Sequence, residues 1–240
     1  MKLAIMADIH ANLEAFQAVL EDSKEQRCTH YVFLGDFVGY CADPKACIDI
    51  VRAMNAPCVK GEHDEYCATE MPMDGYPPIV AKSVEWTRKQ LTVDDRNWLR
   101  QLPLVRTVED FTIVHATLDY PERWAFVFDV SAAASSLAYQ RTSVCFFGHT
   151  HIPIALVGGG IVRGGTYTKF ETRSGRKYFV NVGSVGQPRD GDPRAAYVIY
   201  DMEESSIELR RLDYDIPGAQ KKIIEAGLPP RMAERLAMGK

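Results

Sequence analysis

Short runs of apolar residues along the chain predict buried strands, and five of these runs end in an acidic residue or a histidine. The most regular run is Tyr31-Val32-Phe33-Leu34, which leads into Gly35-Asp36. A continuous apolar run of this length is typical of a strand buried on both faces. The other runs lie at 3–7, 56–60, 111–114 and 144–147. If these strands lie side by side, their polar endings converge at one edge of a sheet.

Between the first runs, apolar residues recur at helical spacing. Leu13, Phe16 and Leu20 predict an amphipathic helix after His10. Asp43-Pro44 predicts a second helix, with Asp as N-cap and Pro at the first helical position. The resulting order β-α-β-α-β implies parallel strands joined by right-handed crossovers.

The later part of the chain is patterned differently. Its predicted elements are helices near 79–90 and 93–102, a β-hairpin at 196–200 and 207–212, and a helical C-terminal stretch. We expect one domain over 1–240, with a helical insertion near 66–103. The fold class is α/β, or α+β by strict count, because β-α units come first and antiparallel β-structure follows.

A loop after the 111–114 run is rich in aromatic residues, namely Tyr120, Trp124, Phe126 and Phe128. These side chains are compatible with a substrate pocket or with the hydrophobic core. The core is the favoured interpretation, because large aromatic side chains bury much apolar area. Substrate specificity is expected to lie in this loop, 117–130, and in the loops 66–80 and 186–194.

The formal net charge of −4 argues against binding to bulk nucleic acid and disfavours a nuclease. A small phosphorylated substrate remains compatible, because bound metal would reverse the charge locally. No apolar stretch approaches the roughly 18–20 residues that span a membrane. The six cysteines show no CxxC spacing, and no signal peptide is evident. These features predict free thiols and a cytoplasmic location.

The endings of the apolar runs supply a set of candidate metal ligands. They are Asp8, His10, Asp36, Glu62, His115, His149 and His151. Three carboxylates and four imidazoles without a thiolate suit Mn²⁺, Fe or Zn²⁺. The set is too large for one tetrahedral ion and fits two ions about 3.5–4 Å apart that share a carboxylate. In a strand-like Asp-x-His or His-x-His, both side chains would point the same way.

These motifs resemble those of the calcineurin-like metallophosphoesterases. The matching blocks are Asp8-x-His10, Gly35-Asp36, Gly61-Glu62-His63-Asp64, His115 and Gly148-His149-x-His151. The stretch 181–194 resembles the bacterial branch grouped with diadenosine tetraphosphatases and small phosphodiesterases. The resemblance implies a four-layer α/β/β/α sandwich of two mixed sheets flanked by helices.

The resemblance also implies a role for each residue. Asp8, His10 and His151 would hold one metal ion, Glu62, His115 and His149 would hold the other, and Asp36 would bridge them. A small phosphodiester, phosphomonoester or nucleotide would be hydrolysed by in-line attack of a metal-bridging hydroxide. His63 would protonate the leaving alkoxide, and Asp64 would orient the imidazole of His63.

One position departs from the family pattern, because Glu62 stands where asparagine is expected. Ionised glutamate could still ligate and would tighten the second metal, but it would repel a phosphate and cannot donate a hydrogen bond. The alternative function is therefore a metal-binding but catalytically weak sensor or scaffold. Two further residues have open interpretations. Asn12 is a phosphate contact or a helix N-cap, and Arg189 is a phosphate contact or a solvated loop residue.

Overall fold

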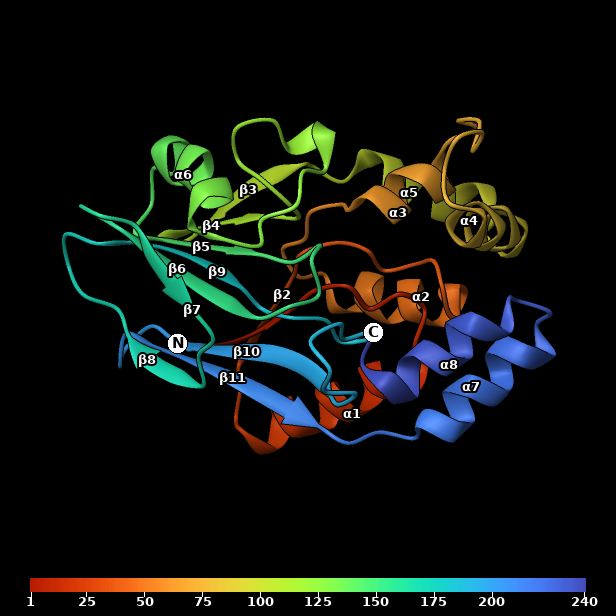
Figure 1. The fold of residues 1–240 in the computed structure, drawn as a ribbon. Coiled ribbons are helices and arrows are strands. Elements are labelled where there is room, and N and C mark those ends of the chain that lie inside the picture. Colours follow the sequence, from red (N-terminus) through yellow and green to blue (C-terminus); the bar gives the residue numbers. More distant parts are fainter.

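Two mixed β-sheets packed face to face form the centre of the protein in the computed structural model, which describes residues 1–240 (Figure 1). The first sheet contains, in spatial order, β2 (His30–Phe33), β1 (Lys2–Met6), β10 (Ala195–Asp201), β11 (Ser206–Leu212) and β8 (Lys169–Glu171). The second contains β3 (Val105–Val108), β4 (Phe111–Val114), β5 (Val144–Phe147), β9 (Lys177–Asn181), β6 (Ile154–Gly158) and β7 (Arg163–Gly165). The pairs β1–β2, β4–β5 and β5–β9 are parallel, and the other pairs are antiparallel.

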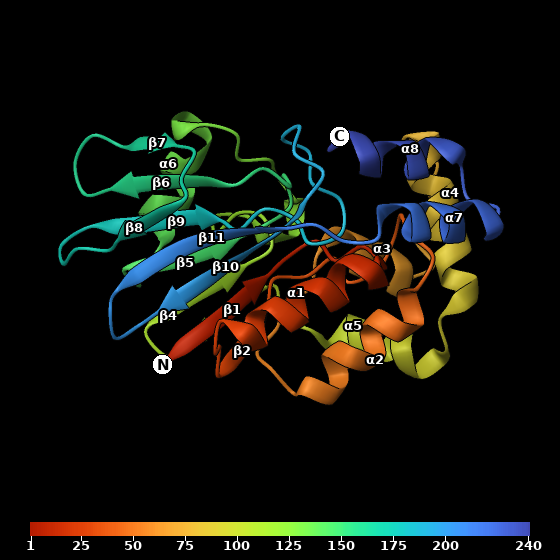
Figure 2. The ribbon, with the colours of Figure 1, turned by 90° about the horizontal axis from the view of Figure 1, so that it is seen from below.

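Helices cover the outer faces of both sheets and gather at one end of the molecule (Figures 1 and 2). They are α1 (Leu13–Glu25), α2 (Pro44–Met54), α3 (Glu62–Ala68), α4 (Pro78–Gln90), α5 (Val93–Gln101), α6 (Val130–Tyr139), α7 (Ile216–Glu225) and α8 (Pro230–Met238), with a 3-10 turn at Pro121–Arg123. None of these helices combines the length and the apolar character needed to cross a membrane.

Alternation along the strands produces the layers. In β1, Leu3 and Ile5 pack in the apolar cluster between the sheets, whereas Ala4 and Met6 pack on the side of α1. In β5, Phe147 and its alternating neighbour Cys145 face α6. Both faces of each sheet are therefore apolar, and the protein is the expected α/β/β/α sandwich of two mixed sheets.

Most of the predicted elements are present, with a few differences. The run 56–60 is not a strand, because only Cys58 pairs, through an isolated parallel bridge to Phe33. Helix α3 was not expected and begins at Glu62. Asp43 precedes α2 but makes no capping bond, and its carboxylate pairs with Lys222 at 2.8 Å. The description of 66–103 as an insertion in a single domain stays a prediction, although α4 and α5 lie within it.

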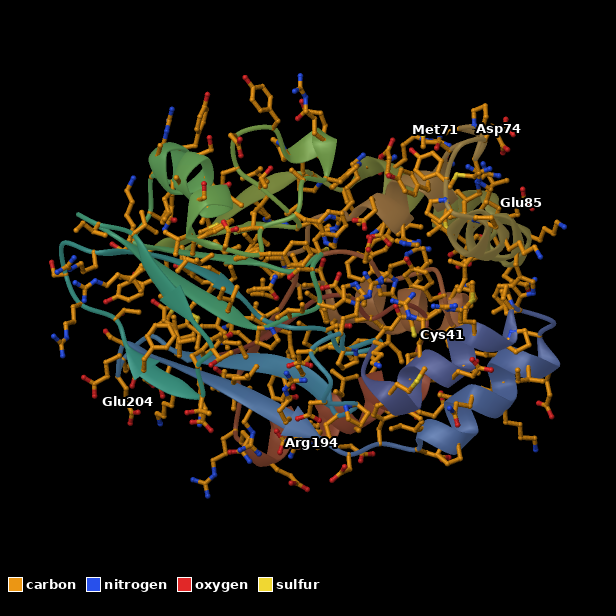
Figure 3. The ribbon with its side chains drawn as sticks, viewed as in Figure 1. Cys41, Met71, Asp74, Glu85, Arg194 and Glu204 are labelled. Carbon is orange, nitrogen blue, oxygen red and sulfur yellow. The ribbon has the colours of Figure 1, made fainter.

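Charged side chains lie on the surface of the protein, whereas the cysteines lie in its interior. Asp74 lies in the loop before α4, and Glu85 lies on α4. Both are exposed, as are Arg194 and Glu204 (Figure 3). Cys41 lies in the interior of the helical end (Figure 3), and all six cysteines are free and buried. Burial raises the pKa of all six thiols, so they stay protonated and act as small apolar side chains.

A charged cluster ties α1 to the first sheet and predicts a pH-dependent stability. The Asp22 carboxylate accepts hydrogen bonds from Tyr197 at 2.6 Å and from Arg210 at 2.8 and 3.1 Å. Burial acts to raise the pKa of Asp22, but these hydrogen bonds hold it below its usual value of 3.8. A depressed pKa in the folded state stabilises the protein above the unfolded-state pKa, and this contribution is lost as the pH falls through the folded-state value.

Asp22→Asn should therefore lower the free energy of unfolding by about 1–3 kcal/mol near pH 7. The difference from the parent should shrink below about pH 4, where the carboxylate protonates. Urea unfolding of both proteins at several pH values measures this difference in the free energy of unfolding. Asp49→Asn is the matched control, because Asp49 forms only an exposed pair with Lys45. A difference between parent and Asp22→Asn that stays constant across this pH range would contradict the expectation.

Candidate metal centre

Most of the predicted ligands sit on tight turns after the strands, whereas Glu62 begins α3. Five of the seven, namely Asp8, His10, Asp36, His149 and His151, have left-handed backbones with φ between 49° and 67°. Such a conformation costs about 1–3 kcal/mol for a non-glycine residue and persists only where the surroundings enforce it. The expected strand alternation is therefore not what aligns Asp8 with His10 or His149 with His151. Their common direction comes from these strained turns.

Asp8, His10 and His151 form the first cluster, as predicted. The Nε2 atoms of His10 and His151 lie 3.1 Å apart, and Asp8 Oδ1 lies 3.4 Å from His151 Nε2. All three side chains are buried. Two imidazole nitrogens and a carboxylate oxygen thus converge from strands that are far apart in sequence.

Glu62, His115 and His149 form the second cluster. Glu62 Oε2 lies 2.8 Å from His115 Nε2, and Glu62 Oε1 lies 2.9 Å from His149 Nδ1. Both contacts lack hydrogen-bond geometry, since Glu62 Oε2 and the two ring nitrogens have no hydrogen-bond partner. The three side chains therefore lie together, and the role of Glu62 as a ligand of a second ion stays a prediction.

Asp36 lies between the clusters. Its Oδ2 is 3.5 Å from His10 Nε2 in the first cluster and 3.5 Å from His115 Nε2 in the second. The same oxygen is buried and has no hydrogen-bond partner. This is the position that a bridging carboxylate requires.

The other ring nitrogen of each cluster histidine bonds to a backbone carbonyl. His10 Nδ1 contacts Val38 O at 3.0 Å, and His115 Nδ1 contacts Leu34 O at 2.7 Å. The two remaining contacts are His151 Nδ1 to Gln187 O at 2.5 Å and His149 Nε2 to Trp124 O at 2.8 Å. A carbonyl only accepts, so each contacting nitrogen carries a proton, and the opposite nitrogen, which faces the cluster, is the one that could ligate a metal ion.

The donor set fits bound cations. Burial raises the pKa of Asp8 to about 6, and burial together with the charge of Glu62 raises the pKa of Asp36 well above its usual range. Close carboxylates that are buried together disfavour ionisation unless positive charge lies between them. The unpartnered atoms Asp36 Oδ2, His115 Nε2 and His149 Nδ1 supply the oxygen and nitrogen ligands that Mn²⁺, Fe or Zn²⁺ accept.

His63 lies beside the first cluster. Its ring centroid is 4.9 Å from that of His10 and 4.4 Å from that of Tyr40, and its Nδ1 is buried without a partner. Burial lowers the pKa of His63 to about 4. The ring is therefore neutral in the protein alone, and the negative charge of a bound phosphoester would favour its protonated form.

Asp64 does not hold the ring of His63, which corrects the expected contact. Its carboxylate accepts backbone N–H bonds from Asp36 at 2.7 Å, Phe37 at 2.9 Å and Gly61 at 3.0 Å. The backbone N–H of His63 in turn donates to Asp36 Oδ1 at 2.9 Å. Asp64 thus fixes the turn that carries Asp36, and it acts on His63 only through that turn.

The two candidate substrate contacts have different surroundings. Asn12 is buried, caps α1 through Ala15 N at 3.1 Å, and donates to Gly186 O at 2.8 Å. The structure thus supports its role as a cap, and its phosphate contact stays a prediction. The guanidinium of Arg189 lies 5.5 Å above the ring of Tyr40, which adjoins His10 and His63.

The segment 181–187 braces the ligand turns, a role that sequence reasoning missed. Asn181 donates to Gly148 O at 2.5 Å, and Ser184 donates to Asp8 O at 2.9 Å. A glycine is also required at position 61, where the chain passes close to the side chain of Asp36. A Cβ on Gly61 would lie 2.1 Å from Asp36 Oδ1, which leaves no room for a side chain. The sequence signal for the bracing role of 181–187 was the Asn-Val-Gly-Ser-Val-Gly-Gln pattern, but this pattern does not show which turns the segment contacts.

Comparison with known proteins places the chain among phosphoesterases. The sequence profile of the calcineurin-like phosphoesterase superfamily domain matches residues 1–205. A protein of Methanocaldococcus jannaschii, described as uncharacterized, is 34% identical over 244 residues, which cover 99% of this chain and 98% of the relative.

Two solved structures extend over the whole chain. The crystal structure of a metallophosphoesterase from Sphaerobacter thermophilus matches with a TM-score of 0.86 and 34% identity, covering 100% of this chain and 99% of that one. The crystal structure of a hypothetical protein from Pyrococcus horikoshii OT3 matches with a TM-score of 0.80 and 19% identity, covering 100% and 98%. The second likeness concerns the fold alone.

The fold and the paired His/Asp clusters thus define a metallophosphoesterase scaffold with metal-binding character. The chain belongs to the calcineurin-like phosphoesterase superfamily.

Proposed function

We propose that the protein is a metal-dependent phosphoric ester hydrolase for a small phosphodiester, phosphomonoester or nucleotide. The observation that carries this proposal is the position of Asp36, whose unpartnered Oδ2 lies 3.5 Å from a histidine of each cluster. A bridging carboxylate between two sets of nitrogen and oxygen ligands is the arrangement of dinuclear hydrolases. Assignment to the diadenosine tetraphosphatase-like branch is a finer prediction within this proposal.

The ligand roles follow the two clusters. Asp8, His10 and His151 would hold one ion, Glu62, His115 and His149 would hold the second, and Asp36 would bridge them. Two bound ions would lower the pKa of a water to make it a nucleophile and would offset charge on the phosphoryl oxygens.

Residues of the chain would position and protonate the substrate. His63, with its free Nδ1, would donate a proton to the leaving oxygen. Arg189 would bind a phosphoryl oxygen, because its side chain lies over Tyr40 beside both His10 and His63. No serine or cysteine nucleophile is needed, so no covalent enzyme intermediate is expected.

Elemental analysis of protein purified without chelator or affinity metal, paired with assays on nitrophenyl phosphate esters and added Mn²⁺, tests the proposal. Two ions per chain with turnover would support the hydrolase and show that Glu62 is a tolerated ligand. Two ions without turnover would favour the sensor or scaffold. One ion or none would contradict the dinuclear centre.

Glu62 is the observation that favours the second candidate, a metal-binding but catalytically weak sensor or scaffold. Its carboxylate lies between His115 and His149, where its charge would repel an incoming phosphate.

Glu62→Asn separates the two functions. If the protein is a hydrolase, the parent turns over esters, and the variant should bind the second ion about tenfold or more weakly, because an ionised ligand is lost. If it is a sensor or scaffold, the variant should gain hydrolysis that the parent lacks. Metal titration and ester assays on both proteins measure the outcome. Glu85→Gln, on an exposed residue of α4, is the control.

A further inference from the structure

The aromatic loop after β4 is exposed, contrary to the core placement that its composition favoured. Phe126 is 51% exposed, Phe128 is 55% exposed and Tyr120 is 50% exposed, while Trp124 is half-buried. Of the ten phenylalanines in the chain, only Phe126 and Phe128 are exposed. Exposed phenylalanine forgoes the free energy of burial, so a pair of them in one place calls for an explanation.

The loop that carries the two rings is anchored in the fold. Val127, between them, is 1% exposed and packs in the apolar cluster that includes Leu137 of α6 and Phe147 of β5. The carbonyl of Trp124 accepts the hydrogen bond from His149 Nε2 at 2.8 Å. The outward direction of Phe126 and Phe128 is therefore fixed by an inward anchor and by a bond to the second cluster.

The two rings form a row that begins at the metal centre. Phe126 stacks on the His149 imidazole, with centroids 4.2 Å apart and an interplanar angle of 25°. Phe128 lies next to Phe126, with centroids 5.5 Å apart and planes within 3° of each other. Parallel planes at this separation form an offset stack, so His149, Phe126 and Phe128 make a stack that leads away from the second cluster and ends at the exposed ring of Phe128.

An exposed aromatic ring at the end of a stack that begins at the second cluster suits a planar group on the substrate. Base–aromatic stacking tolerates any base, because every base has a π-face. The exposed part of the stack consists of two rings, and its segment is flanked in sequence by the exposed polar residues Glu122 and Asp129, so it matches one planar group better than a broad protein interface.

We propose that Phe126 and Phe128 form a platform on which the base of a nucleotide substrate stacks while its phosphate lies at the metal centre. This inference rests on the proposed hydrolase function and selects nucleotides among the small phosphoesters that the centre could accept.

Matched substrates with and without a base test the platform. Adenosine 5′-phosphate is compared with ribose 5-phosphate, and the methyl diester of each is included, with release of phosphate or methanol as the readout. The parent should show a KM about tenfold or more lower for the substrates with the base. Phe128→Ala, which leaves the ring against His149 in place, should remove most of that preference, and Phe126→Leu should reduce it.

Tyr139→Ala is the control, because Tyr139 is an aromatic residue of α6 with 59% exposure. The Tyr139→Ala variant should prefer substrates with the base over substrates without it to the same extent as the parent. Equal KM values for substrates with and without the base, or an undiminished preference in Phe128→Ala, would overturn the platform while hydrolysis itself stands.

Absence of all hydrolysis would instead contradict the proposed function, and calorimetry on the Mn²⁺-loaded protein then decides the platform. Tighter binding of adenosine 5′-phosphate than of ribose 5-phosphate in the parent, lost in Phe128→Ala, would support it. Equal binding of the two compounds would overturn it.

Discussion

Replacing Asp36 by asparagine should remove the ability to retain two metal ions and lower ester turnover by about 10³-fold, since bound ions supply several kcal/mol of transition-state stabilisation. Asp36 Oδ2 is the carboxylate oxygen placed 3.5 Å from both His10 and His115. An asparagine amide is neutral and turns either a carbonyl or an NH₂ toward that space, so it cannot supply the charge that two cations share.

The asparagine variant should still fold. Its side-chain carbonyl can accept the His63 backbone N–H, which Asp36 Oδ1 now accepts at 2.9 Å. Elemental analysis after gel filtration and kcat with a nitrophenyl ester measure the effect, and the melting temperature reports on folding. Asp74→Asn, at an exposed loop position, is the control and should retain both ions (Figure 3). Two ions per chain in Asp36→Asn, with parental affinity, would disprove the bridging role.

His63→Gln should lower turnover by about 10²–10⁴-fold while leaving both ions bound, because general acid catalysis contributes a factor of this size. The loss should depend on the leaving group. Nitrophenolate leaves without much help from a proton, whereas an alkoxide does not, so the variant should lose more activity on an alkyl ester than on a nitrophenyl ester. A comparison of kcat for the two esters, together with metal content, measures this.

The control for His63 is His30→Gln, because His30 is exposed at the start of β2, outside both clusters. It should leave metal content and both rates unchanged. Equal losses on the two esters in His63→Gln, or a loss of metal, would show that His63 acts by holding the centre together. The cluster of His10, Asp36 and His63 makes that outcome physically possible, so metal content is the decisive second readout.

Local patterns were sufficient for elements whose signals are contained in a few residues. The runs 111–114 and 144–147 are strands with those bounds, and the predicted helix near 93–102 is α5, which begins with a capping box formed by Thr92 and Asp95. The prediction of a strand at 56–60 was wrong, because a strand also needs a paired neighbour along its length and only Cys58 has one. The prediction that the aromatic loop packs in the core was wrong for a related reason. The apolar character of a side chain does not show whether another part of the fold covers it.

The sequence by itself determined which side chains meet at the centre, because each ligand directly follows or closely adjoins an apolar run or a glycine turn. The apolar runs also indicated strands buried on both faces, and the resemblance of the motifs to a known family implied the two packed sheets. Only the tertiary structure decided how the ligands are aimed. The left-handed turns, the carbonyls of Leu34, Val38 and Trp124 that fix the ring nitrogens, and the exposure of Phe126 and Phe128 all depend on contacts between segments distant in the chain. Such contacts leave no local period in a sequence, because the side-chain patterns that are readable there report only the helix and strand repeats.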